Sequence, residues 1–373
     1  MPFCFRLFPI LIFASVLSLC AAPFTVFAQE LHNDLQGTYR ARVIEVRSEE
    51  TRTVPGGESG VETIYQELEA RLLDGPKDGQ MVIAANDYLE LEVGDTFFLN
   101  HFVDINGSER YFVSEPDRRT GLLWFAALFV FVVVLFGGWQ GARSLVSLAL
   151  SFYLIAAFLL PTLIAGYSPA IISIAMAALI LVLVMLLTHG FTRTTYVALG
   201  GTILAIFATG ILAHVAIVVT RLSGFFSEEA IYLNLNTGGT LDMQGLFLGA
   251  VIIGVLGLLD DVAITQVHTV AELRKSGASG AQAFTRALRV GREHVSALVN
   301  TLALAYTGAA LPVLLLFSLS EQSALLLVNR EIFAAEIIRT TVGSIGLILT
   351  VPLTTWLAVW FKVGDSDRHE STT

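Results

Sequence analysis

Long apolar runs fill the last two thirds of the chain, whereas apolar and polar residues alternate in the first third. From Thr120 onward, each run approaches the roughly 20 residues that a helix needs to cross a bilayer. The earlier alternation is typical of half-buried strands. The pattern therefore predicts a polytopic α-helical membrane protein with a small N-terminal β domain. About seven spans are expected, at 120–138, 144–165, 168–188, 195–219, 243–262, 295–319 and 336–361.

The first 28 residues have the features of a secretory signal peptide. Arg6 precedes an apolar run that ends at Leu19, and Val26-Phe27-Ala28 places small residues where signal peptidase cleaves. Because the apolar run is long, an uncleaved anchor stays open as the alternative.

Residues 29–119 carry five short runs of strand-like alternation, beginning with Tyr39–Arg47. Turn signals such as Asn106-Gly107 separate them. Five strands in a segment of this length predict a small β-barrel of the OB or SH3-like kind. The other runs are Glu62–Leu73, Gln80–Ala85, Thr96–Val103 and Arg110–Ser114.

Composition supports this division of the chain. Hydrophobic residues make up 54% and charged residues 14%, against roughly 25% charged residues in soluble domains. Residues 30–119 hold 19 of the 32 acidic side chains and 9 of the 22 basic ones. This acidity argues against a nucleic-acid partner. The expected surroundings are the lipid bilayer, with an envelope protein or a second copy of the chain as further partners.

Basic residues predict the orientation, since cytoplasmic loops are enriched in Lys and Arg. With seven spans and the β domain outside the cell, nine basic residues fall on the cytoplasmic side and four on the other. We therefore expect a cytoplasmic-membrane protein whose domains are a signal segment (1–28), an extracytoplasmic β domain (29–119), a membrane domain (120–361) and a cytoplasmic tail (362–373). The nine residues are Arg143, Arg193, Arg274, Lys275, Arg286, Arg289, Arg292, Lys362 and Arg368.

The most informative stretch is Gly245–Glu272, which begins apolar and ends with ionisable residues. At about 100° per residue, one face of this helix is first small and then ionisable. Carboxylates and a histidine near membrane depth can attract cations or relay protons. This face consists of Ala250, Gly254, Gly257, Asp261, Thr265, His268 and Glu272, and Asp260 lies beside it.

Two later helices carry similar stripes of small and polar residues. The first includes Asn300 and Thr307, and the second includes Glu336, Gly343 and Gly346, with Arg339 beside it. These stripes have two interpretations. They either line a path through the last three spans, or they form the packing seam of a helix bundle, in which Gly254, Gly257, Gly343 and Gly346 allow close approach.

The sequence gives little support for an enzymatic function. The chain has no G-x-S-x-G or P-loop pattern, no closely spaced pair of zinc-binding histidines, and only Cys4 and Cys20, both in the signal segment. An intramembrane aspartyl hydrolase would need a second membrane aspartate facing Asp261, for which only Asp242 remains besides the adjacent Asp260. We therefore expect no enzymatic activity, no cofactor and no metal site.

Several uncommon motifs occur in order along the chain and resemble those of the YibE/F-like family. They are WQGARSL at 139–145, THGFTRTT at 188–195, GVLGLLDDVAITQVHTVAEL at 254–273 and VGREHVSALVNTLALAYTGAALP at 290–312. The resemblance extends from about Tyr39 to Ala358. It implies a multi-span bacterial membrane protein with an extracytoplasmic N-terminal domain, and it draws attention to Asp261 rather than Asp260. It implies no substrate.

Two functional hypotheses follow. The first is a transporter or channel for a small solute or ion, which uses the last three spans. The second is a component of an envelope assembly or a sensor, in which the β domain binds a partner and the spans serve as its anchor.

Overall fold

A computed structural model describes residues 36–53, 62–87, 89–104, 106–320 and 323–365. The predicted signal segment and the last eight residues of the tail lie outside the described residues. The chain divides into two compact units, which meet within one long helix between Phe136 and Gly137. Each unit is described by itself below.

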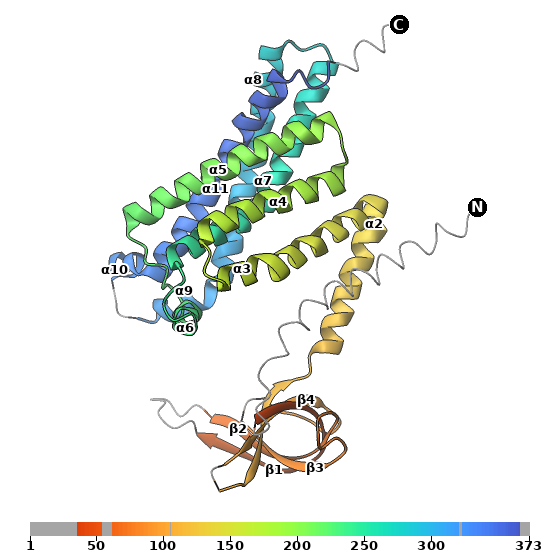
Figure 1. Ribbon diagram of the computed structural model, residues 1–373, viewed down its shortest axis with the longest axis vertical. Coiled ribbons are helices and arrows are strands. Elements are labelled where there is room, and N and C mark those ends of the chain that lie inside the picture. Colours follow the sequence, from red (N-terminus) through yellow and green to blue (C-terminus); the bar gives the residue numbers. More distant parts are fainter. Residues whose placement is uncertain (1–35, 54–61, 88, 105, 321–322, 366–373) are drawn as a thin grey trace, which may run out of the picture. The chain divides into compact units, whose positions relative to one another are not determined.

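The first unit contains a closed five-stranded barrel (Figure 1). Its neighbours follow the order β1-β2-β3-β5-β4, and the single parallel pair, β3 with β5, helps to close the sheet. The strands alternate as predicted, so that one set of side chains fills the interior. The predicted barrel of five strands is confirmed. The strands are β1 (Gln36–Thr53), β2 (Glu62–Leu72), β3 (Met81–Asn86), β4 (Thr96–Val103) and β5 (Glu109–Pro116).

A buried polar network lies inside the barrel. The Gln66 side chain is 1% exposed, and its amide nitrogen donates to Leu91 O at 3.2 Å. Its amide oxygen accepts hydrogen bonds from Leu91 N at 3.0 Å and from Asn86 Nδ2 at 2.8 Å. Since buried polar groups are costly without partners, these bonds hold the segment after β3 against the barrel.

The rest of the described chain is almost entirely helical. Ser227, Asp242 and Ser279 accept backbone hydrogen bonds at the starts of three helices, as good N-cap residues do. The elements are α2 (Arg119–Leu154), η1 (Ile155–Leu159), α3 (Leu160–Ile164), α4 (Pro169–His189), α5 (Arg193–Thr220), α6 (Glu228–Asn236), α7 (Met243–Lys275), α8 (Gly280–Ala309), α9 (Leu311–Ser318), α10 (Ala324–Asn329) and α11 (Glu331–Trp360).

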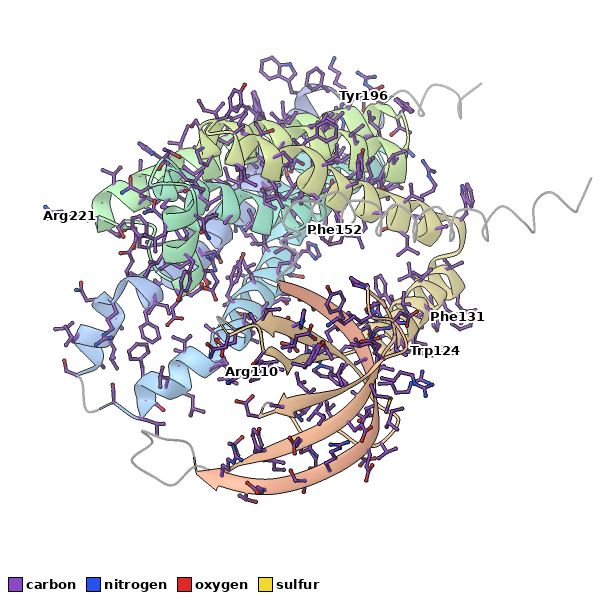
Figure 2. The ribbon with its side chains drawn as sticks, turned by 60° about the horizontal axis from the view of Figure 1, so that its bottom comes forward. Arg110, Trp124, Phe131, Phe152, Tyr196 and Arg221 are labelled. Atoms are coloured by element: carbon purple, nitrogen blue, oxygen red, sulfur yellow. The ribbon has the colours of Figure 1, made fainter. Side chains whose placement is uncertain are left out.

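Helix α7 is the centre of the helical unit and packs against α4, α5, α8 and α11 (Figure 1). Its Val251, Val255 and Leu259 are fully buried. Towards the outside, large apolar side chains remain exposed, among them Phe152 at 58% and Tyr196 at 52% (Figure 2). A bundle that is apolar on its outside as well as in its core is typical of helices in lipid, because lipid tails are as apolar as the core side chains.

Gln266 shows how the three central helices are joined. Its buried amide nitrogen donates to Ala287 O of α8 at 2.7 Å and to Thr355 Oγ1 of α11 at 2.8 Å. Gly291 faces the same side chain, since a Cβ at that position would lie 2.8 Å from Gln266 Oε1. Neither residue belongs to the stripes singled out from the sequence.

The structure gives a smaller number of spans than the predicted seven. Among the described residues, five helices are long and apolar enough to cross a membrane, or six if α8 and α9, bent by 62°, form one span. The difference arises because the first two predicted spans belong to one 46-residue element, Arg119–Ile164. Gly138, with φ 55° and ψ −135°, interrupts that element, so the number seven stays a prediction.

The predicted span 295–319 also differs in its details. It does not begin at residue 295, because α8 runs unbroken from Gly280, through the basic residues around Arg289, to Ala309. The break comes just before Pro312, which lies in the first turn of α9. A proline there is favourable because its nitrogen has no hydrogen to donate.

Candidate functional site

The stripe predicted on α7 is the exposed side of this otherwise buried helix. All seven of its residues, from Ala250 to Glu272, are exposed, whereas Val255, Leu259 and Val262 on the other sides are buried. Within one chain, most of this face is therefore not a packing seam. An exposed face of small and ionisable residues is unusual at membrane depth, where polar side chains commonly face protein or water.

An open pocket of about 750 Å³ lies at the C-terminal end of this face. Four predicted residues come together in it: Asp261, Thr265, His268 and Glu272. His189, the last residue of α4, contributes from the side, and Gln140 of α2 and Thr269 of α7 complete the polar lining. The pocket thus combines two carboxylates, two imidazoles, two hydroxyls and an amide, which can hold a hydrated cation or pass protons.

His189 and Gln140 were not predicted as site residues. His189 precedes Gly190, which ends α4 with a φ of 77°. A tight turn follows, in which Thr192 N donates to Gly190 O at 3.1 Å. That the turn places an imidazole beside α7 depends on tertiary packing, which has no signal in the local sequence.

A second cavity, of about 580 Å³, lies between α8, α9 and α11. Its charged residues are Glu336 and Arg339, joined by a hydrogen bond of 2.5 Å between Arg339 Nη1 and Glu336 Oε1. The guanidinium carbon lies 5.5 Å from the ring centre of Phe247 and 5.8 Å from that of Tyr306. Aromatic faces stabilise a desolvated cation, so Arg339 is held by a carboxylate and by rings together.

Tyr306 of the second cavity reaches the small-residue part of the α7 face. A Cβ added to Gly254 on that face would lie 2.8 Å from the Tyr306 hydroxyl oxygen. Phe247 beside Arg339 precedes Asp261 by 14 residues, or about 21 Å of helix. The two polar clusters are thus separated by a large part of the roughly 30 Å hydrocarbon core.

Thr307 lines the second cavity with Glu336 and Arg339, as the path hypothesis expects. Two predicted residues stand apart from the linings of both cavities. Asn300 is exposed on α8. Asp260 is half-buried, and its Oδ1 has no hydrogen-bond partner among the described residues.

The four glycines divide between the two interpretations. Gly343 and Gly346 of α11 are buried, and a Cβ on Gly343 would lie 2.6 Å from Val255 Cγ1. Gly346 is in equally close contact with Thr209 of α5. Gly257, in contrast, has nothing within 4 Å of its Cβ position. Gly254 has one neighbour, the Tyr306 hydroxyl of α8. Helix packing therefore explains the two glycines on α11 and a contact at Gly254, and it does not explain Gly257 or the ionisable part of the stripe on α7.

Across residues 36–365, apart from the short gaps given above, no three His, Cys, Asp or Glu side chains are grouped so that they could hold a metal ion.

Comparison with known families decides the identity of the helical unit. The family described as YibE/F-like protein matches residues 125–363, nearly all of the helical part. The chain belongs to the YibE/F-like family. The match excludes the barrel, so the predicted resemblance is confirmed for the membrane part alone. No curated protein and no solved structure matches the chain. Family membership and the apolar helices together identify a multi-pass membrane protein.

Proposed function

We propose that this YibE/F-like protein transports a small ion or solute along the exposed face of α7. The observation that carries the proposal is the exposure of all seven stripe residues on the central helix. Along the helix, these residues change from small ones beside Tyr306 to the ionisable ones of the pocket at the C-terminal end of α7, which we call the inner pocket. Small side chains leave room for a permeating species, and carboxylates attract cations.

The bundle supports a topology with the inner pocket on the cytoplasmic side. At the C-terminal end of α7, Arg274 Nε donates to Asp365 Oδ1 at 2.9 Å, and Arg193 Nη2 donates to Phe361 O at 2.8 Å. Three connections rich in basic residues thus meet at one end. At the other end, Glu331 accepts a hydrogen bond from Gly224 N at 2.7 Å, which joins two connections with few basic residues.

This arrangement agrees with the positive-inside rule for a bacterial cytoplasmic membrane. In our proposal the break at Gly138 separates two spans, which brings the number to seven and leaves the barrel outside the cell. A reporter enzyme that is active only in the cytoplasm, fused after Asp365, should be active. A second reporter, which is active only outside the cytoplasm, should be inactive at the same position. Activity of this second reporter would contradict the topology.

The transport proposal is tested by flux through protein reconstituted in vesicles. Asp261→Asn keeps the size of the side chain and removes its charge, so the flux of the transported cation should fall at least about tenfold, as for the loss of one charge-assisted interaction. Glu293→Gln is the matched control, because Glu293 is an exposed carboxylate on α8 outside both cavity linings. Equal flux in the two variants would remove Asp261 from the mechanism.

The barrel favours the second candidate, an envelope assembly or sensor component. It is a closed domain with its own core, and it lies outside the matched family residues. This candidate expects that deletion of residues 30–117 abolishes function in cells while Asp261→Asn has no effect. The transport proposal expects the opposite for Asp261→Asn.

A further inference from the structure

One end of the barrel holds a pocket of about 290 Å³ that is separate from the membrane site. It lies where β1 begins, β4 ends and β5 begins, beside the turn between β2 and β3. Barrel mouths are common places for ligands, and a pocket of this size suits a small molecule. The side chains that give it its chemistry are Tyr39, Asp74, Lys77, His101, Glu109 and Tyr111.

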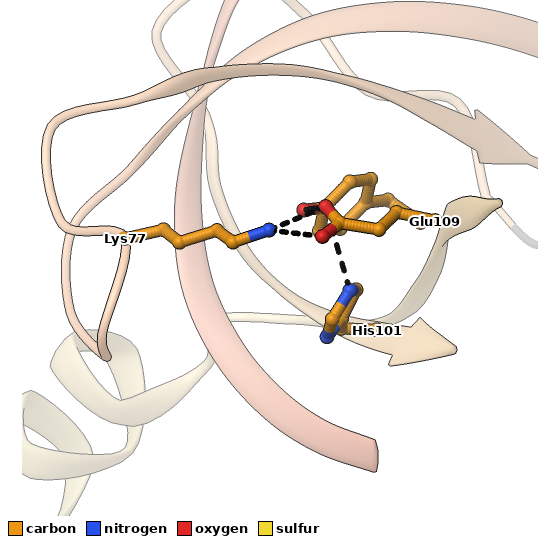
Figure 3. Close-up of polar contacts among 4 residues, drawn as sticks. Lys77, His101 and Glu109 are labelled. Atoms are coloured by element: carbon orange, nitrogen blue, oxygen red, sulfur yellow. Dashed lines mark hydrogen bonds and ion pairs between the residues drawn. The ribbon is translucent and has the colours of Figure 1, made fainter. Parts of the chain in front are cut away.

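The centre of the pocket is the carboxylate of Glu109 (Figure 3). Lys77 Nζ donates to both of its oxygens, and Tyr111 Oη donates to Oε2 at 2.8 Å. These bonds lower the pKa of Glu109, first through Lys77 and then through Tyr111, and the bond from Lys77 to Glu109 raises the pKa of Lys77. An ammonium group and a carboxylate are thus both held in their charged forms.

His101 forms the floor of the pocket and is only 8% exposed. Its Nε2 has no hydrogen-bond partner among the described residues, although Glu109 Oε2 lies 3.7 Å away. Its ring stacks on Tyr111, with centroids 4.9 Å apart and planes inclined by 21°. A buried polar atom without a partner costs free energy, so a ligand that brings a polar group beside His101 Nε2 would relieve this cost.

Two glycines make room for the third aromatic ring. A Cβ at Gly37 would lie 2.5 Å from Tyr39 Oη, and one at Gly75 would overlap the same ring. Gly75 also has a φ of 85°, which side chains with a Cβ rarely adopt. The absence of side chains at Gly37 and Gly75 therefore lets the Tyr39 ring lie against the pocket at this end of the barrel.

The charges favour a cationic ligand over an anionic one. The lining has two carboxylates, Asp74 and Glu109, and one ammonium, Lys77. Residues 30–119 as a whole hold 19 acidic and 9 basic side chains. The faces of tyrosine rings attract cations. The position beside Glu109 already holds an ammonium group, which belongs to Lys77.

We propose that the barrel mouth is a binding site for a small organic ammonium ion, which takes the place beside Glu109 that the Lys77 ammonium group occupies. Lys77 lies on the turn between β2 and β3, and its side chain is 36% exposed, so it can move into solvent. It acts as an internal competitor for the ligand. The site is independent of transport through the membrane part, and each can fail without the other.

The test measures binding of n-butylammonium to the full-length protein in detergent by isothermal titration calorimetry. This probe reproduces the four carbons and the ammonium group of a lysine side chain. The wild-type protein should bind it, and Lys77→Ala should bind it at least about tenfold more tightly, because the competitor is gone. Glu109→Gln should weaken binding by about tenfold or more, since a charge-assisted hydrogen bond is lost.

Controls separate this site from general attraction by an acidic domain. Glu69→Gln removes another ion-paired carboxylate, that of Glu69 with Arg47 at 2.7 Å, and should leave binding unchanged. n-Butanol, which has the same carbon chain without the charge, should not bind. Circular dichroism verifies that each variant is folded.

The source of the ammonium group is distinguished in nanodiscs. If the natural ligand is a lipid headgroup, ethanolamine phospholipids should compete with n-butylammonium and glycerol phospholipids should not. If it is a free amine, neither lipid competes. The proposal is overturned if the wild type does not bind the probe, if Glu109→Gln binds it as well as Glu69→Gln does, or if Lys77→Ala binds it no better than the wild type.

Discussion

Replacing Gln266 by methionine tests whether one buried amide joins the three central helices. Methionine has nearly the same length and flexibility, so the replacement removes hydrogen bonds with little change in volume. Two bonds are lost, to Ala287 O on α8 and to Thr355 Oγ1 on α11. The Thr355 hydroxyl still donates to Val351 O at 2.6 Å, so the substitution leaves this hydroxyl with a hydrogen-bond partner.

The expected magnitude follows from the number of bonds. A neutral hydrogen bond contributes a net ~0.5–1.5 kcal/mol, and bonds between membrane helices average ~0.6 kcal/mol. Gln266→Met should therefore lower the free energy of unfolding by about 1–3 kcal/mol. The measurement is reversible unfolding in mixed micelles, followed by circular dichroism.

Gln244→Met provides the graded control. Gln244 is exposed, and its side chain donates one hydrogen bond, to Leu222 O at 2.7 Å. Its replacement should cost about half as much or less. If Gln266→Met unfolds with the same free energy as the wild type, or if the control costs more, the assigned role of Gln266 is refuted.

Two further predictions concern packing and pH. Gly346→Ala places a methyl group against Thr209 and should lower the free energy of unfolding by ~1–3 kcal/mol. Gly257→Ala, whose added methyl group has nothing within 4 Å, should be neutral or stabilising. Both variants are unfolded in micelles, and equal effects would contradict the packing. The pKa of Glu109 is lowered chiefly by Lys77 and that of Asp117 chiefly by Arg119. Their contribution to stability is therefore complete above about pH 5 and is lost as pH falls through the lower folded-state values. Thermal unfolding of the barrel between pH 6 and 2.5 should show this loss, and Glu109→Gln should show less of it; an unchanged slope in that variant would contradict the assignment.

Local patterns were sufficient to predict the barrel. Alternation and turn residues place four of the five strands within two residues of their observed bounds, because a half-buried strand must alternate and a tight turn needs Gly, Asn or Asp. The first strand was predicted too short, as Tyr39–Arg47, and is observed as Gln36–Thr53. The closure through a parallel pair, β3 with β5, was not predictable in this way. It depends on which strands meet in space.

The helical part shows a different limit of sequence reasoning. Hydropathy identifies apolar helices, yet it cannot decide whether Arg119–Ile164 counts as one span or two, because a single interruption at Gly138 makes the difference. Periodicity correctly grouped Asp261, His268 and Glu272 on one face. It could not reveal that this face is exposed while the similar stripe on α11 is buried, since both consist of the same kinds of residues.

The candidate site was predicted in part for the same reason. Residues on one helix, such as Asp261 and Glu272, share a pocket because helix geometry alone brings them together. His189 and Gln140 reach the pocket from other helices, and Asn300 does not reach it. Contacts between helices depend on packing, which a single sequence does not reveal.

The central claim is that the exposed face of α7 lines a water-filled path, and a cysteine scan tests it most directly. Cys4 and Cys20 are the only cysteines of the chain, so replacing both by serine gives a background for single cysteines along α7. In reconstituted protein, a water-soluble thiol reagent should modify cysteines at 254, 257, 261, 265 and 268 and reduce flux, and it should leave those at 255, 259 and 262 unmodified. If cysteines at 254 and 257 react with the reagent as little as those at 255 and 259 do, the result contradicts a water-filled path.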